Sequence, residues 1–168
     1  TGAKNVLVGY QAGSSITDSN NVFVGHRAGI VATSGEANTF LGSNTGINTT
    51  TGTSNTFVGA YAGELNENGS GNAALGDNSG PSTTSLINAT AIGSRAQVAQ
   101  NNSLVLGAIN GVNGAAANTR VGIGTTTPNA TLTVSDGNGI QVTSAAGDIG
   151  LNITQGRMVL SYGTVANG

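Results

Sequence analysis

The sequence predicts an all-β fold, a parallel β-roll or β-solenoid with coils of about 17 residues. The first reason is a repeated phrase, which reads Asn5-Val-Leu-Val-Gly9-Tyr-Gln-Ala-Gly13 in its first copy and Asn55-Thr-Phe-Val-Gly59-Ala-Tyr-Ala-Gly63 in its fourth. The second is spacing, because the first glycine of the phrase falls at positions 9, 25, 42, 59, 76, 93 and 107. The third is texture: Gly, Asn, Ser and Thr surround short apolar runs, which is typical of strands closed by turns. Each coil is therefore expected to stack its strand on the next, about 4.8 Å away.

Two apolar residues precede the first glycine of each phrase, and strand geometry sends their side chains to opposite faces. The residue next to the glycine is always a branched aliphatic, so we expect it to point into the coil. These residues are Val8, Val24, Leu41, Val58, Leu75, Ile92 and Leu106. The residue before it includes every Phe of the chain, and it would leave an apolar stripe in water unless another chain covered it. This second set is therefore predicted to pack between chains: Leu7, Phe23, Phe40, Phe57, Ala74, Ala91 and Val105.

An asparagine opens each of the first five copies of the phrase. Because the copies keep register, we expect these side chains to stack one above another as a ladder: Asn5, Asn21, Asn38, Asn55 and Asn72. Stacked amides can hydrogen-bond along the axis and satisfy the backbone of turns. The glycines of the phrase are expected to supply positive φ angles and close approach between coils.

The chain divides into three segments. Residues 1–107 form the repeat region, residues 108–118 form a Gly- and Ala-rich connector, and residues 119–168 form a β-rich neck or tail. Within the tail, strands are predicted at 119–124, 130–134, 140–143, 149–154 and 157–162, with a tight turn at 136–139. This tail is too small to bury much surface alone, so we expect it to interlock between chains. It is also a candidate to pack onto the first coil of a following assembly and so to build a filament.

Composition excludes several classes of function. Charged residues are only 7% of the 168, the net charge is −2, and no basic patch is present, so no nucleic-acid partner is expected. The chain has no cysteine, which excludes disulfides and thiolate metal sites. No stretch is long and apolar enough to span a bilayer. Because the chain begins at Thr1 rather than Met, we expect a processed product or a fragment.

The sequence gives no pattern typical of an active site, so neither an enzyme nor a cofactor is predicted. His26 is the only histidine and occupies a variable position of the repeat; the alternative is a ring of three His26 side chains around a trimer axis that holds a metal or anion. The carboxylates fall at different phases of the repeat, and they are Asp18, Glu36, Glu64, Glu67, Asp77, Asp136 and Asp148. The nearest pair, Glu64 and Glu67, lies in a polar loop, which argues against a glycosidase or lyase.

The stretch from Ala89 to Gly107 contains Ala-Ile-Gly-x-x-Ala followed by Asn-Ser-Leu-Val-Leu-Gly. It resembles the head repeats of trimeric autotransporter adhesins of the YadA type. The earlier Asn-Thr-Phe-Val-Gly-x-x-Ala-Gly copies, and the stretch from Val121 to Val134, resemble β-rolls of phage and bacterial tail fibres. This resemblance implies a homotrimeric, surface-exposed fibre. The chain departs from the adhesin pattern in the longer step of its first coils.

These observations lead to one main hypothesis and one alternative. The main hypothesis is a non-enzymatic structural component of a trimeric extracellular fibre or filament, acting as an adhesin or spacer at a cell surface. The alternative is a receptor-binding tail-fibre segment of a phage or contractile injection system, with a host glycan or surface receptor as partner. Its candidate contact residues near the turns are Tyr10, His26, Arg27, Tyr61 and Arg95. Ice binding is disfavoured, because Thr residues such as Thr49–Thr53 do not keep one column.

Overall fold

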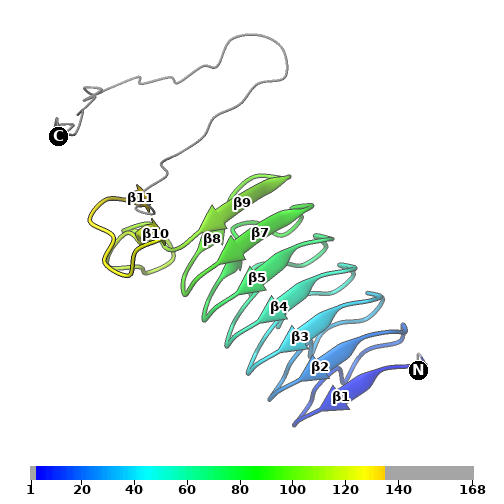
Figure 1. Ribbon diagram of the computed structural model, residues 1–168. Coiled ribbons are helices and arrows are strands. Elements are labelled where there is room, and N and C mark those ends of the chain that lie inside the picture. The colour runs from blue at the N-terminus through cyan, green and yellow to red at the C-terminus, as the bar shows by residue number, and fades with distance from the viewer. Residues whose placement is uncertain (1–2, 135–168) are drawn as a thin grey trace, which may run out of the picture.

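The computed structural model describes residues 3–134, and these residues form a β-solenoid without a helix (Figure 1). Seven strands, one per coil, stack into a parallel sheet in the order β1-β2-β3-β4-β5-β7-β9. Their bounds are Val6–Val8, Val22–Val24, Thr39–Leu41, Thr56–Val58, Ala73–Leu75, Ala89–Ile92 and Ser103–Leu106. The predicted fold class and the coil length of about 17 residues are confirmed, since Phe40 of β3 pairs with Phe57 of β4. The strands and turn predicted beyond Val134 lie outside the described residues.

The opposite side of each coil is less regular than the sheet. Within the described residues, two short strands form there, β6 (Gly80–Pro81) and β8 (Gln97–Val98), and they pair in parallel. In the earlier coils the backbone still bonds from one coil to the next on this side: the amide of Gly46 donates to the carbonyl of Ala62 at 2.9 Å, and that of Gly63 to Ser79 at 2.8 Å. Both sides of the coil therefore contribute backbone hydrogen bonds along the axis.

The phenylalanines fill the interior of the coil, which corrects the direction predicted for the strand side chains. Phe23, Phe40 and Phe57 are fully buried within one chain, and their rings stack with centroids 4.7 and 5.1 Å apart. Ala74 and Ala91 are buried at the equivalent positions, Val105 packs against the core, and Leu7 is 41% exposed at the end of the stack. The three phenylalanines, Ala74 and Ala91 therefore belong to the core of a single chain and not to an interface between chains.

The aliphatic residues next to the glycines point outward, where the prediction had placed them inside. Val8 is 55% exposed, Leu41 is 47% exposed and Leu75 is 52% exposed. The reason lies across the coil, where the returning backbone has glycines that leave room for the rings. A Cβ atom built on Gly46 would lie 2.5 Å from the ring of Phe40. The larger aromatic residue occupies the enclosed space and the smaller aliphatic residue faces outward.

The core changes composition along the axis. Gly63 lies across the interior from the inward residue Phe57. Where the inward residue is the smaller Ala74 or Ala91, the opposite side of the coil contributes the fully buried Pro81 or Val98. Side chains from β6 and β8 thus fill the volume that the missing rings would leave. The interior therefore stays filled along the axis, although its large side chains come from the sheet in the earlier coils and from the opposite side in the later ones.

Glycines set how closely the coils approach. Gly42 has φ of 140°, and a Cβ atom on it would lie 2.6 Å from the carbonyl oxygen of Gly59 in the next coil. Two residues further on, each turn has a non-glycine residue in the left-handed region: Gln11, Arg27, Asn44, Tyr61, Asn78 and Arg95, with φ between 53° and 60°. This backbone geometry, repeated in the first six coils, turns the chain out of the sheet.

Residues 108–119 form a loop that closes on itself after the last coil. The amide of Thr119 donates to the carbonyl of Ala108 at 2.9 Å, and the amide of Asn110 donates to the side chain of Asn118 at 2.8 Å. Beyond the loop, β10 (Val121–Ile123) and β11 (Leu132–Val134) lie at the C-terminal end of the stack (Figure 1). They pair in parallel, so residues 124–131 form a crossover connection and not a hairpin.

Candidate functional site

The outward side of the seven-stranded sheet is mostly apolar, with threonine as its only polar residue type. We call it the aliphatic face and define it by the two outward residues of each strand. One column is Val8, Val24, Leu41, Val58, Leu75, Ile92 and Leu106; the other is Val6, Val22, Thr39, Thr56, Ala73, Thr90 and Leu104. None of these residues is charged. An uninterrupted apolar stripe of this length is a candidate interaction surface.

The asparagine ladder is confirmed, and its role is structural. The side-chain oxygen of Asn38 accepts the backbone N–H of Asn55 at 2.9 Å, and that of Asn55 accepts the N–H of Asn72 at 3.0 Å. Each side-chain nitrogen donates to the carbonyl of a glycine or another turn residue, as Asn55 does to Gly69 at 2.8 Å. Asn21, Asn38, Asn55 and Asn72 are at most 1% exposed. These buried amides connect coils and are not available to a ligand.

The five predicted contact residues do not form one cluster. Tyr10 is 69% exposed and stacks on His26, with ring centroids 5.6 Å apart and planes inclined by 12°. Arg27 lies in the same early turns. Tyr61 lines a hollow further along the stack, and the guanidinium of Arg95 donates to the carbonyl of Gly114 in the closing loop.

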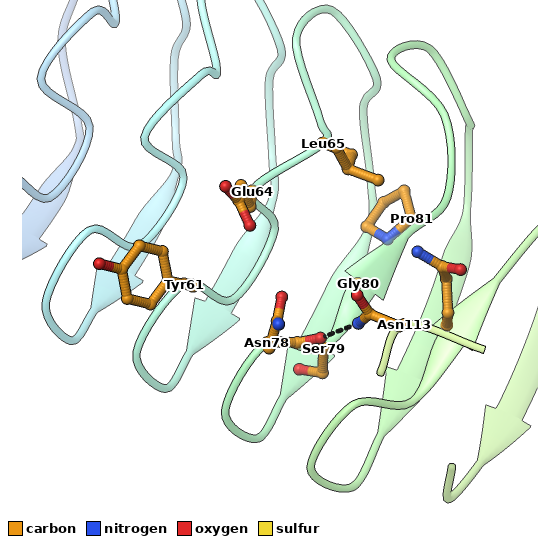
Figure 2. A pocket seen from close by; sticks show the side chains of 9 residues that line it. Tyr61, Glu64, Leu65, Asn78, Ser79, Gly80, Pro81 and Asn113 are labelled. Carbon is orange, nitrogen blue, oxygen red and sulfur yellow. Dashed lines mark hydrogen bonds between the residues drawn. The ribbon is translucent and has the colours of Figure 1, made fainter. Parts of the chain in front are cut away.

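Figure 2 shows the hollow in which Tyr61 lies, on the side of the coil away from the aliphatic face. Its volume is about 140 Å³, and its lining residues are Tyr61, Glu64, Leu65, Asn78, Ser79, Gly80, Pro81, Gln97 and Asn113. Tyr61 and Glu64 lie on one side of it, with Pro81 and Asn113 on the other (Figure 2). Asn113 comes from the closing loop, and its side-chain nitrogen donates to the backbone carbonyl of Asn78. Residues 35 positions apart in the chain therefore meet in one site.

The groups that could support catalysis are dispersed. His26 is exposed and stacked on Tyr10, and Glu67 is exposed on a loop. Glu64 is the carboxylate that reaches the hollow. Among residues 3–134, no three His, Cys, Asp or Glu side chains gather in a group that could hold a metal ion. Asp136 and Asp148 lie outside the described residues.

Comparison with protein-family models, with curated proteins and with solved structures finds no match to this chain. In the described part of the chain, no helix is long and apolar enough to cross a membrane.

Reasoning from the sequence missed the hollow entirely. Its far wall depends on the closing loop, where Gly, Ala and Asn show no apolar periodicity that would predict docking onto the coils. It also missed Thr49 and Asn66, which are fully buried in segments that read as polar loops. Their spacing of 17 residues, one coil, could have predicted that they stack on each other. In the structure the hydroxyl of Thr49 donates to the carbonyl of Asn66 at 3.2 Å.

Proposed function

We propose that this chain is a non-enzymatic structural segment of an extracellular fibre in which three copies pack together through their aliphatic faces. The single observation that carries the proposal is the aliphatic face itself, whose central residues Leu41 and Leu75 are about half exposed in one chain. Apolar surface of this extent is stabilised by removal from water, at about 25 cal/mol for each Å² covered. The number of copies comes from the resemblance to trimeric fibres.

A second copy of the same chain fits this face better than an unrelated protein does. The face presents one branched aliphatic residue per coil at the axial spacing of a parallel sheet, about 4.8 Å. A partner with the same spacing can match every residue of the stripe. Another copy of the chain has that spacing because it has the same fold. The lack of charged residues on the face also removes the repulsion that would arise when identical surfaces meet.

The experiment is a mass measurement by light scattering, supported by sedimentation, on the wild-type chain and two variants. Leu41→Lys places a charge in the centre of the aliphatic face, whereas Val31→Lys places one at an exposed valine outside the seven strands. We expect the wild type and Val31→Lys to have the mass of three chains. We expect Leu41→Lys to dissociate, because a buried unpaired charge costs several kcal/mol, roughly, at each copy of the interface.

A wild-type chain that is monomeric at micromolar concentration would refute the proposal. So would a Leu41→Lys variant that keeps the mass of the wild type. A stable dimer would be consistent with the aliphatic face as the interface but would contradict the proposed number of three copies. Electron microscopy of the same samples distinguishes discrete rods from continuous filaments.

A further inference from the structure

We propose that the hollow between Tyr61 and Asn113 binds a neutral saccharide unit, on the side of the coil opposite the aliphatic face. This inference goes beyond the proposed self-association and does not depend on it. It rests on the lining of the hollow, on the loop that closes it and on its position.

The lining combines apolar surfaces with hydrogen-bonding groups. Tyr61 is 44% exposed and Leu65 is 43% exposed, so these two side chains supply the apolar surface that a ligand could reach. A pyranose ring has apolar C–H groups on its faces, which pack against an aromatic ring, and hydroxyl groups around its rim. The mixed lining suits such a ring better than it suits a wholly apolar ligand.

The polar groups of the hollow match hydroxyl groups in both directions. The carboxylate of Glu64 only accepts hydrogen bonds, whereas the side-chain amides of Asn78, Gln97 and Asn113 both donate and accept. Within residues 3–134, the side chains of Glu64, Asn78 and Gln97 make no hydrogen bond to another protein group. These groups are available to a ligand whose every hydroxyl must donate once and can accept twice.

The closing loop fixes one wall of the hollow before any ligand arrives. The side chain of Asn113 bonds to the carbonyl of Asn78, and the guanidinium of Arg95 bonds to the carbonyl of Gly114. Ala115 of the same loop is buried. A wall held at several points loses little freedom on binding, which favours affinity in a shallow site.

The charge of the lining argues against anionic ligands and against a calcium ion. No cationic side chain lines the hollow, and the carboxylate of Glu64 would repel an anion, so acidic sugars, phosphates and sulfates do not fit. A single carboxylate is also too few for a calcium ion, which takes six to eight oxygen ligands. A neutral, polyhydroxylated ligand fits both the charge and the mixed lining of the hollow.

The position of the hollow leaves it open when the aliphatic face is covered. Gly63 lies across the interior from the sheet, because a Cβ atom on it would touch the ring of Phe57. Gly80, which lines the hollow, lies directly beside Gly63 in the next coil. The hollow is therefore separated from the aliphatic face by the aromatic core, and each copy in an assembly would present one site.

The test is saturation-transfer difference NMR with glucose, galactose, mannose and N-acetylglucosamine as probes, followed by titration of each sugar that responds. Sialic acid serves as the anionic comparison. The variants are Tyr61→Ala, which removes the ring, and Asn113→Ala, which removes the amide of the loop. Tyr10→Ala is the matched control, since Tyr10 is an exposed tyrosine outside the hollow. The mass of every sample is measured in parallel, so that loss of binding is separated from loss of association.

We expect at least one neutral sugar to bind with a dissociation constant of about 1 mM. The constant should rise at least tenfold, by order of magnitude, in Tyr61→Ala and in Asn113→Ala, and stay unchanged in Tyr10→Ala. Absence of binding to all four neutral sugars overturns the proposal. Equal binding by wild type and Tyr61→Ala also overturns it, as does binding of sialic acid alone.

Discussion

At the scale of single residues, the buried amides hold the coils in register. The side chain of Asn55 makes three kinds of contact at once: it accepts the N–H of Asn72, donates to the carbonyl of Gly69 and donates to the side chain of Asn38. The amide has its acceptor oxygen and its two N–H donors on separate atoms, whereas a Ser or Thr hydroxyl has one donor on the same atom that accepts. A register slip would break these bonds in every coil, because the ladder is continuous.

The first prediction is that Asn55→Ala lowers the free energy of unfolding by about 2–4 kcal/mol. The substitution leaves the backbone N–H of Asn72 without its acceptor in a fully buried place. Urea denaturation followed by circular dichroism measures the change. Asn48→Ala is the matched control, since Asn48 is exposed and only its nitrogen donates, to the carbonyl of Glu64 at 2.9 Å. The control should lose less than about 1 kcal/mol; equal losses would show that the ladder contributes no more than a surface bond.

At the scale of the coil, glycine positions limit how the chain stacks. Gly42 and its equivalents bring the backbone of one coil against the carbonyl of the next. A side chain there would meet backbone atoms of the neighbouring coil, and these cannot rotate away as a side chain can. The coil spacing and the glycine column therefore depend on each other.

The second prediction compares two glycines that both have positive φ. Gly42→Ala should destabilise the chain by more than about 3 kcal/mol or prevent folding, because the added Cβ atom meets the carbonyl of Gly59. Gly111→Ala should cost only about 1–2 kcal/mol, since a Cβ atom there has nothing within 4 Å. Thermal unfolding of both variants at one concentration tests this. Similar midpoints for the two would mean that φ alone, and not coil contact, fixes the glycine at position 42.

The coil also shows which parts of the fold the sequence could predict. The 17-residue period predicted the parallel sheet and the asparagine ladder, because every copy of the phrase repeats the same local chemistry. Alternation along a strand, however, says only that neighbouring residues face opposite ways, and both residues before the glycine are apolar. The choice of Phe40 over Leu41 for the interior depends on Gly46, six residues after Phe40, which leaves room for the ring. The sequence alone could predict this pairing of a large with a small residue only if the course of the chain on the opposite side of the coil were already known.

At the scale of the whole molecule, the described chain has a narrow core and a long exposed apolar face. Its largest fully buried side chains are three stacked rings, and the rest of the interior is built mainly from Ala, Val, Ile, Pro, Asn and Thr. Stability in such a stack is a sum of contacts between neighbouring coils, so no large central core compensates for the exposed stripe. Association through the aliphatic face would add buried area to every coil at once. Folding and assembly are therefore expected to be coupled.

The last prediction follows from that coupling. If only folded chains associate in threes, a tenfold rise in protein concentration stabilises each chain by two thirds of about 1.4 kcal/mol, or about 0.9 kcal/mol. For a chain of this length, that free energy raises the thermal midpoint by about 2–4 °C. Leu41→Lys, which places a charge on the aliphatic face, should have a lower midpoint that does not change with concentration. Val31→Lys should follow the wild type. The measurement is reversible thermal unfolding over two decades of concentration, and a wild-type midpoint that stays constant would show that the single coil stack is stable without its partners.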